Sequence, residues 1–502
     1  MNTPSELISK ARIPHYVTHV TEKLESAGFE AYIVGGCVRD LLLGRTPKDW
    51  DVTTNAIPEE IIPLFTKAVY ENTFGTVAVI VPHETDPETT YTVEVTPYRK
   101  ESEYSDSRHP DSVEFSKTID EDLSRRDFTI NAMAYRISQN VLLDMYKGQE
   151  ALKDKTVVTV GSPKDRFAED ALRILRAVRF SVELGFVISH ETSEAIVSQA
   201  DSVSKLSNER IRDEFSKIIM SPSPALGITM LEKYDLLKHF LPELLEGVGC
   251  EQKGEHIYDV FNHLLHALQH AADKSWHLEI RLSALFHDIG KPRTRRWDGT
   301  KAGGKGKYTF YGHEVVGARM TQKILDRLKY PRKVSDLVVS LVRQHMFFSD
   351  TEAISLSAVR RVVAKVGKEN IWTLMNIREC DRVGMKKVEA PYRLRKYHAM
   401  IDQVLRDPIS VGQLAIDGQI LINELHMKPG PRMGWILHAL LEEVLDDPAK
   451  NSREYLDRRV GELDLLSDAE LKTLGEQAKE SKDALEEQEV SKLHAKHGVH
   501  KK

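Results

Sequence analysis

The chain has 502 residues, which excludes a single ordinary hydrophobic core and predicts about three or four domains. Hydrophobic residues make up 41% and charged residues 29%, a balance typical of soluble globular proteins, and no long apolar run predicts a membrane span. The net charge of -6 requires any phosphate-binding surface to be a local concentration of Lys and Arg. Three widely spaced cysteines argue against a disulfide framework and predict a cytoplasmic location.

The first distinctive stretch, residues 33–53, follows a predicted helix over 17–27 and reads as strand, glycine turn, short helix, loop and strand. Gly35 and Gly36 allow a sharp turn and a close approach of the backbone to a ligand. Side chains alternate along a strand, so Asp49 and Asp51 share one face and Trp50 takes the other. Each motif alone is more often an ordinary turn or strand end. Together, a carboxylate pair and glycines that face phosphate indicate a Mg2+-dependent nucleotidyl-transfer site.

The next predicted elements are a helix over 58–65 and strands over 76–81 and 91–96. Alternation in the last strand places Glu94 on one face, where it is either a third carboxylate of the metal site or an exposed strand residue. Residues 98–114 are polar without periodicity, which predicts a mobile loop, either solvated or a lid. In the stretch 121–134, Arg125 or Arg126 is suited to clamp a triphosphate through its guanidinium fork, with a surface pair to Asp127 as the alternative.

From Phe167 onward the periodicity becomes helical, with Asp170, Arg173, Arg176 and Arg179 recurring every third residue. Asp170 beside Arg173 offers an acceptor and a rigid donor fork, which can read a nucleobase edge. The alternative is a solvated ion pair worth about 0.2–0.5 kcal/mol, and the residues alone favour it. A further helix over 207–220 carries two pairs at four-residue spacing that predict structural ion pairs, Arg210 with Glu214 and Asp213 with Lys217.

Five motifs in this order, over roughly residues 30 to 220, resemble the motif set of bacterial tRNA nucleotidyltransferases (class II CCA-adding enzymes) and their poly(A) polymerase relatives: GGCVRD, KDWDV, EDLSRRDFTINAMA, EDALRILRAVRF and ERIRDEFSK. The resemblance implies an α+β fold, with a polymerase-β-like head that holds a small sheet, followed by an all-α neck and body and a helical tail. It implies Asp49 and Asp51 as Mg2+ ligands and places three groups on the triphosphate, Gly36, Arg39 and Arg126. It further implies that the row beginning at Asp170 contacts the nucleotide.

Residues 106–111, DSRHPD, stand where the family has a loop that often reads Asp-Gly-Arg-Arg-Pro-Asp, which favours competence for the final A over a CC-only enzyme. The Gly-Arg-Arg-Phe type of signature expected of a bacterial poly(A) polymerase is absent, because residues 72–76 read NTFGT.

The second half carries histidines and aspartates on successive apolar helices: His263, His287, Asp288, His313, His345 and Asp381. Imidazole and carboxylate ligands together suit a mono- or dinuclear divalent-metal site that activates water. The set resembles the HD phosphohydrolase superfamily over roughly residues 255 to 385. The similarity implies Asp381 as the last ligand, leaves His313 and His345 for a second metal, and predicts a divalent transition metal or Mg2+. The alternative is a degenerate scaffold that only helps to bind tRNA.

These patterns predict five parts: a head over 14–152, a neck that binds RNA and nucleotide over 153–247, an HD domain over 248–395, a tail over 396–465 and a charged, partly disordered extension over 466–502. The predicted function is template-independent addition of CCA to tRNA 3′ ends from CTP and ATP, with HD phosphohydrolase activity as a second hypothesis and no membrane partner. A poly(A) polymerase or A-adding enzyme is the alternative within the family. An HD hydrolase with a non-catalytic RNA-binding head is the alternative from another class.

Overall fold

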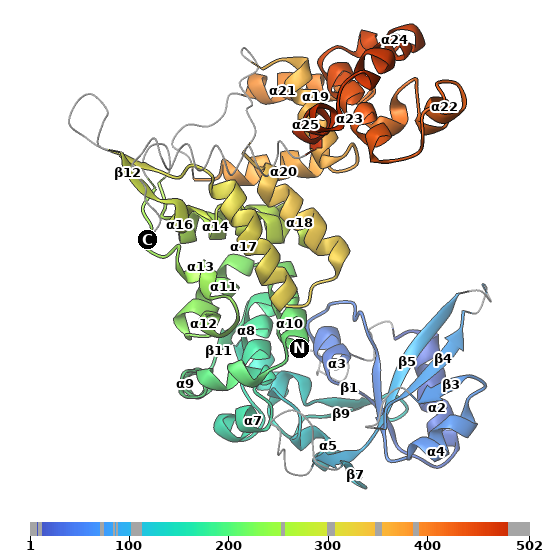
Figure 1. Cartoon of the computed structure of the whole chain (residues 1–502). Helices are drawn as coiled ribbons and strands as arrows, with labels where there is room; N and C mark the ends of the chain where they lie inside the picture. Colours follow the sequence, from blue (N-terminus) through green and yellow to red (C-terminus); the bar gives the residue numbers. More distant parts are fainter. Residues whose placement is uncertain are drawn as a thin grey trace. The chain divides into compact units, whose positions relative to one another are not determined.

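The computed structural model describes residue 8 and residues 13–70, 75–83, 86, 89–101, 113–252, 257–298, 307–346, 354–384 and 391–479. The chain forms two compact units, Met1–Phe240 and Leu241–Lys502. The first contains a mixed sheet and helices, and the second is largely helical, which confirms the predicted α+β class (Figure 1). Among the described helices, none combines the length and the apolar character that crossing a bilayer demands.

The head is built on a seven-stranded sheet in the order β3-β4-β5-β2-β1-β8-β9. Strands β2 and β5 run parallel, and the other neighbouring pairs run antiparallel. The strands are β1 (Ala31–Val34), β2 (Asp51–Thr54), β3 (Ala68–Tyr70), β4 (Val77–Pro82), β5 (Thr90–Pro97), β8 (Ala134–Arg136) and β9 (Val141–Leu143).

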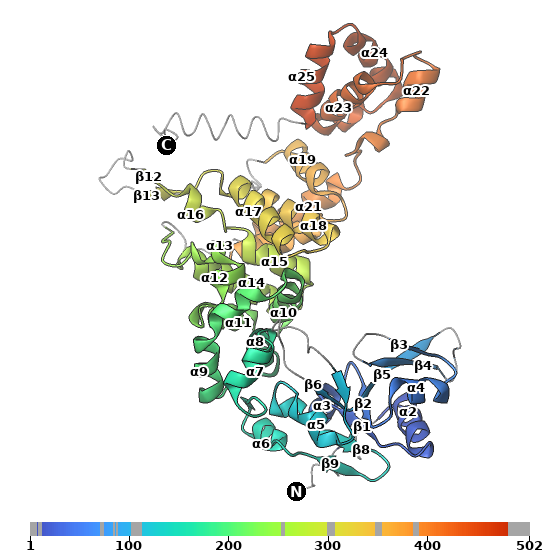
Figure 2. The same ribbon diagram turned by 60° about the horizontal axis from the view of Figure 1, so that its bottom comes forward.

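Helices of the head confirm most of the predicted order. Helix α2 (His15–Ser26) packs against β1 and β5, and α3 (Gly36–Leu42) begins directly after β1. The predicted helix over 58–65 is α4 (Pro58–Ile61) followed by the 3-10 turn η1 (Ile62–Leu64). Helix α5 (Ile119–Ser124), the 3-10 turn η2 (Thr129–Asn131) and α6 (Gly148–Lys153) complete the head (Figure 2).

The prediction of a loop over 98–114 is wrong at both ends of the segment. Strands β6 (Arg99–Glu101) and β7 (Val113–Phe115) pair antiparallel, and the Ser116 N–H donates to the Tyr98 carbonyl at 2.7 Å. The pairing is made by backbone groups, so polar side chains without periodicity do not prevent it. Residues 102–112, including the DSRHPD motif, lie outside the described residues, as do 72–74 of the NTFGT stretch.

The neck is a bundle of helices joined by short turns. Its helices are α7 (Pro163–Glu169), α8 (Leu172–Leu184), α9 (His190–Ser198), α10 (Asn208–Met220), α11 (Pro224–Lys233) and α12 (Leu237–Phe240). Strand β10 (Thr156–Val157), before α7, pairs with β11 (Val187–Ile188), after α8. The predicted continuous helix from Phe167 is interrupted, because Asp170 is extended and its Oδ1 accepts the Leu172 N–H at 3.0 Å. An aspartate side chain competes in this way with the helical backbone bond and starts a new helix.

The second unit contains the helices expected for the HD domain and the tail. They are α13 (Pro242–Leu245), α14 (Val260–Asp273), α15 (Leu278–Phe286), α16 (Lys291–Thr294), α17 (His313–Arg327), α18 (Arg332–Gln344), α19 (Leu356–Val366), α20 (Ile371–Asp381), α21 (Pro391–Val404), α22 (Gly418–Asn423), α23 (Pro431–Asp446), α24 (Arg453–Asp464) and α25 (Asp468–Lys479). A short hairpin, β12 (Arg296–Asp298) and β13 (Lys307–Thr309), connects α16 to α17. One apolar core joins α14, α15 and α18–α21, and a second joins α22–α25.

Candidate functional site

The predicted carboxylates of the head gather at one place on the sheet. Parallel pairing of β2 with β5 sets Asp51 directly opposite Glu94. Asp49 precedes β2 in an exposed bend rather than beginning the strand as predicted, while Trp50 is buried at 6% exposure. Partial burial and the charge of Asp49 raise the pKa of Asp51, whereas Arg126 lowers it. Two close carboxylates of this kind are ligands suited to a hard divalent cation.

Gly35 holds this site in a conformation that only glycine adopts easily. Its φ is 79°, and a Cβ built there would lie 3.1 Å from Nη1 of Arg126 and 3.8 Å from Oδ2 of Asp51. The Gly35 N–H donates to the Met133 carbonyl at 3.2 Å. The glycine therefore lets an arginine and a carboxylate approach the backbone, and its own N–H is already used within the fold.

Arg126 is a cation that acts on Asp51. Its Nη2 donates to Oδ2 of Asp122 at 3.1 Å, and Arg125 holds the other oxygen of Asp122 at 2.7 Å. Burial opposes ionisation of Asp122, but the two arginines outweigh it and lower its pKa. The buried Nε of Arg126 has no hydrogen-bond partner among the described residues. A guanidinium fixed on one side with an unsatisfied donor on another is suited to an anionic ligand.

A polar chain links Arg39 to the neck. Arg39 is buried, and its Nη1 donates to Oδ1 of Asn131 at 2.8 Å. Asn131 donates in turn to Asp127 at 3.2 Å, and Asp127 accepts from Nε of Arg176 at 2.7 Å. Burial opposes the charge of Asp127, but Arg176 outweighs it and lowers the pKa of this carboxyl. Sequence reasoning missed Asn131, although it lies in the EDLSRRDFTINAMA motif.

The row from Asp170 to Arg179 is held by partners inside the fold, so the alternative of a solvated Asp170–Arg173 ion pair is wrong. Asp170 accepts from Arg210 at 2.7 Å, and Arg173 bonds to Glu169 and to the backbone carbonyl of Arg125. Arg173 is only 8% exposed. The row spans the joint between head and neck because its members bond to both.

The pairs predicted on α10 are also wrong. Arg210 bonds to Asp170 rather than to Glu214, and Asp213 bonds to Arg212 rather than to Lys217. Glu214 is 3% exposed and accepts from Arg179 at 3.3 Å. Glu214 also accepts from Lys217, three residues further along α10, at 3.2 Å, so a buried arginine and a helical neighbour share this carboxylate in place of Arg210.

The predicted metal ligands of the second unit converge on the buried carboxylate of Asp288. One side of the carboxylate faces His263 and His287, whose Nε2 atoms are each 3.4 Å from Oδ2. The other side faces His313 at 3.1 Å and His345 at 3.5 Å from Oδ1. Donor atoms of His263, His287, Asp288 and Asp381 lie within 4.8 Å of one another, as do those of Asp288, His313 and His345. All six side chains are buried.

Backbone carbonyls orient three of these imidazoles. The Nδ1 atoms of His287, His313 and His345 donate to the carbonyls of Ala284, Phe310 and Val342 at 2.8, 2.7 and 2.7 Å. A carbonyl only accepts, so Nδ1 carries a proton and Nε2 is the nitrogen that faces Asp288. Such outer contacts are typical of metal-ligating histidines.

The charge of the cluster also fits a cation. Burial opposes the negative charge of Asp288, but Lys291 and His287 outweigh it and lower the pKa of this carboxyl. Burial also opposes the charge of Asp381, and there His287 outweighs it and lowers the pKa. Burial alone would lower the pKa of His287, but the two carboxylates raise it to about 10. Two ionised carboxylates faced by four imidazoles form a donor set that fits one or two divalent metal ions.

Lys291 is a site residue that sequence reasoning missed. Its Nζ lies 2.5 Å from Oδ2 of Asp288 and 2.6 Å from Oε1 of Gln252, and the side chain is buried. Residues 282–292, LSALFHDIGKP, contain the signal, because the lysine follows Asp288 by three residues, almost one helical turn.

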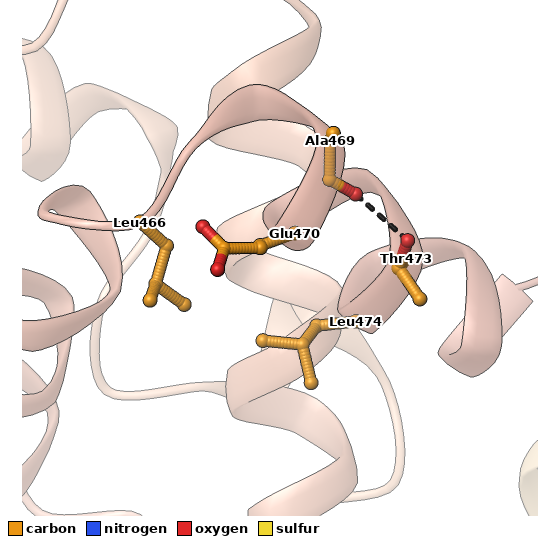
Figure 3. A pocket seen from close by; sticks show the side chains of 5 residues that line it. All are labelled: Leu466, Ala469, Glu470, Thr473 and Leu474. Carbon is orange, nitrogen blue, oxygen red and sulfur yellow. Dashed lines mark hydrogen bonds between the residues drawn. The ribbon is translucent and has the colours of Figure 1, made fainter.

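A separate hollow of about 430 Å³ lies beside α25 in the tail (Figure 3). It is lined by Leu466, Ala469, Glu470, Thr473 and Leu474. The Thr473 hydroxyl donates to the Ala469 carbonyl at 2.7 Å, an ordinary helical bond. This lining includes none of the predicted site residues.

Three family models match separate parts of the chain. Residues 31–158 match the family model described as "Poly A polymerase head domain". Residues 185–247 match "Probable RNA and SrmB- binding site of polymerase A", and 260–383 match "HD domain". The head, with its carboxylates, glycine turn and arginines, together with these matches, makes the protein a nucleotidyltransferase.

Whole-chain relatives make the assignment more specific. A CCA-adding enzyme from Lactobacillus delbrueckii subsp. bulgaricus is 34% identical over 451 residues, covering 86% of this chain and 94% of its own. One from Geobacillus thermodenitrificans is 31% identical over 446 residues, covering 87% and 93%. The crystal structure of the Bacillus stearothermophilus CCA-adding enzyme in complex with CTP aligns with a TM-score of 0.66 at 26% identity, covering 93% of this chain and 100% of that one. The chain belongs to the family of CCA-adding enzymes.

Proposed function

We propose that the protein adds the sequence CCA to the 3′ ends of tRNA, using CTP and ATP without a template strand. The observation that carries this proposal is the pairing of Asp51 with Glu94 next to Asp49, Gly35 and Arg126. Relatives named CCA-adding enzymes, and one solved with CTP, support the choice of substrates.

Asp49 and Asp51 would hold Mg2+, which lowers the pKa of the attacking hydroxyl and stabilises charge on the attacking and leaving oxygens. The 3′ hydroxyl of tRNA attacks the α-phosphorus of the nucleotide, a P–O bond forms, the bond to the leaving pyrophosphate breaks, and the hydroxyl proton passes to solvent. Arg126 would stabilise the triphosphate through its unsatisfied Nε. Glu94 adds a further carboxylate at the same edge of the sheet.

Nucleotide choice would rest on protein side chains in place of a template. Arg210 fixes the side chain of Asp170, and Glu169 fixes that of Arg173. Their remaining hydrogen-bonding atoms would therefore be held in a fixed arrangement toward the edge of a base. Arg39 and Arg176 are joined through Asn131 and Asp127, which would hold the triphosphate and the base reader in register. Arg179 and Gly36 complete the proposed nucleotide contacts.

The direct test supplies purified protein with tRNA lacking CCA and each nucleotide alone and in combination. Addition of two C residues from CTP alone, and of a final A only when both nucleotides are present, is expected. Extension with ATP alone would favour the alternative of a poly(A) polymerase or A-adding enzyme. Inactivity with every nucleotide would favour the alternative of a non-catalytic RNA-binding head.

We also propose a metal-dependent phosphohydrolase activity in the second unit, supported by the convergence of five buried candidate ligands on a sixth, Asp288. A divalent transition metal or Mg2+ held there would activate a water molecule for attack on phosphorus. Finding no metal in the purified protein, and no hydrolysis of phosphoesters with added Mn2+, Ni2+ or Mg2+, would remove this proposal and leave a scaffold role.

We propose the five-part division into head, neck, HD domain, tail and extension as well. The family models and the two compact units have other boundaries, because they divide the chain into fewer parts. A cytoplasmic location is proposed as well, and the three free, buried cysteines support it because they suit a reducing compartment.

A further inference from the structure

We propose that the β12–β13 hairpin is an RNA-binding surface that stacks an unpaired base next to the HD centre. This inference rests on the proposed function in one respect, namely that the chain acts on RNA. The surface consists of Arg295, Trp297 and Tyr308, which share one side of the hairpin, with Arg296 beside them.

The geometry of the hairpin brings flat side chains together. Trp297 pairs directly with Tyr308 across the two strands, and their ring centroids lie 4.9 Å apart in an edge-to-face arrangement. The guanidinium of Arg295 lies over the Tyr308 ring at 3.7 Å from its centroid. Trp297 is nonetheless 55% exposed. A large exposed indole beside a stacked guanidinium is the arrangement on which nucleobases stack.

Charge distinguishes this segment from the rest of the chain. Residues 291–313 contain seven Lys and Arg residues and one acidic residue, Asp298, whereas the whole chain carries a net charge of -6. Two of the seven are already paired, Lys291 with Asp288 and Arg293 with Glu246, and the other five still leave the segment cationic. Cationic side chains with interleaved aromatic residues attract a phosphate backbone and then hold its bases. The composition therefore favours RNA over a protein or an uncharged ligand as the occupant.

The hairpin is anchored to the metal ligands at both ends. Helix α16, which follows the HD pair His287–Asp288 closely in the chain, leads into β12. Strand β13 leads through Phe310 to His313, whose Nδ1 donates to the Phe310 carbonyl at 2.7 Å. Lys291, bound to Asp288, lies 5.8 Å from the Phe310 ring centroid. RNA held on the hairpin is therefore bound to a segment whose two ends lead to residues of the HD centre.

A simpler interpretation is that Trp297 and Tyr308 only stabilise the hairpin, because cross-strand aromatic pairs contribute to sheet stability. That interpretation predicts a change in thermal unfolding and none in RNA binding. Both readouts are therefore needed.

The test uses the full chain and a short single-stranded oligoribonucleotide carrying a fluorophore and a photoreactive uridine. Ultraviolet crosslinking followed by peptide mass spectrometry is expected to place a crosslink on the peptide containing Trp297. Trp297→Ala is expected to weaken binding, measured by fluorescence anisotropy, by about 5- to 100-fold, which is the range for loss of one stacked base. Trp297→Phe, which keeps a stacking ring, should recover most of the affinity.

Two matched variants from the same unit serve as controls. Trp372→Ala removes another partly exposed indole, 38% exposed, and Arg332→Ala removes an arginine whose side chain is 93% exposed. Neither is expected to change RNA binding. Arg295→Ala combined with Arg296→Ala should also reduce the slope of log affinity against log salt by about 0.7 for each phosphate that the two arginines neutralise.

Unchanged binding by Trp297→Ala, with crosslinks only elsewhere in the chain, would overturn the inference. Equal binding of single-stranded RNA, duplex RNA and anionic vesicles would also overturn it, because charge alone would then explain the surface. CTP addition by the wild-type chain is measured in parallel. Its absence contradicts the proposed function, whereas the crosslink reports the hairpin independently of any nucleotide addition or hydrolysis.

Discussion

The two candidate centres differ in how completely the folded chain assembles them. Around Asp288, five further buried candidate ligands converge, and carbonyls fix three of the imidazoles. In the head, Asp49 and Glu94 are exposed and Asp51 is partly buried. In the part of the chain that the structure describes, groups of three or more close metal donors occur only in the second unit.

From this difference we infer at which stage each centre would bind its metal. A buried set of protein donors binds a cation without substrate, whereas Mg2+ on two open carboxylates takes its remaining ligands from substrate phosphates and water. The head is therefore expected to depend on its nucleotide to complete the metal site. The HD centre is expected to hold metal in the resting protein.

The largest expected effect is that of replacing Asp51 in the head. Asp51→Ala removes the partly buried metal ligand and is expected to lower the rate of CTP and ATP addition by about a thousandfold or more, because metal stabilisation of the transition state is lost. Single-turnover extension of radiolabelled tRNA measures the rate. Asp154→Ala, at an exposed helix end of the same unit, serves as the control. Substantial activity of Asp51→Ala would refute the assigned site.

The next largest effect tests whether the head and the HD centre work independently of each other. Asp288→Ala removes the carboxylate shared by both ligand groups, so bound metal per chain, measured by plasma mass spectrometry, is expected to fall at least tenfold. CTP addition is expected to persist, because none of the head residues contributes to this cluster. Undiminished metal content in a folded variant would show that these residues are not ligands.

Sequence reasoning was most successful where chemistry depends on residue type. The six side chains predicted as HD ligands lie together in the fold, and Glu94, predicted as either a third carboxylate or an exposed strand residue, lies opposite Asp51. Imidazole and carboxylate chemistry and strand alternation are local properties that a sequence reveals. Ion-pair partners were predicted poorly. Arg210 and Glu214 are close in sequence, yet each bonds elsewhere, to Asp170 and to Arg179 respectively. Tertiary packing decides which of these partners bond, and the spacing of residues along a helix carries no information about tertiary packing.

The same limit explains the remaining errors. The pairing of β6 with β7 depends on backbone groups rather than on side-chain pattern. The break at Asp170 depends on a side-chain bond to the Leu172 N–H, which an apolar stripe does not reveal. Lys291 was overlooked because its three-residue spacing from Asp288 does not reveal that both side chains are buried.

A moderate effect is expected from the base-reading row. Arg173→Ala removes a buried guanidinium fixed by Glu169 and is expected to reduce the preference for CTP and ATP over GTP and UTP by about tenfold, because one directional contact to a base is worth about 1–3 kcal/mol. Ratios of kcat/KM for the four nucleotides measure this preference. Discrimination equal to that of the wild type would exclude base reading by Arg173.

The smallest effect concerns the polar chain between head and neck. The pKa of Asp127 is lowered in the fold, so its stabilising contribution is complete above its unfolded pKa, near pH 4, and is lost as the pH falls through the lower folded value. Asp127→Asn is expected to lower the free energy of unfolding by about 1–3 kcal/mol at pH 7, and the difference should shrink below about pH 4. Urea unfolding at several pH values measures it. A constant difference across this range would contradict the ionised bond to Arg176.

The measurement that tests the central claim most directly is sequencing of the 3′ ends made when the purified chain receives tRNA lacking CCA and all four nucleotides together. A head that reads nucleotides through its own side chains predicts products that end in CCA and grow no further. A run of A residues, an unselective mixture of nucleotides, or tRNA that stays unextended would contradict it.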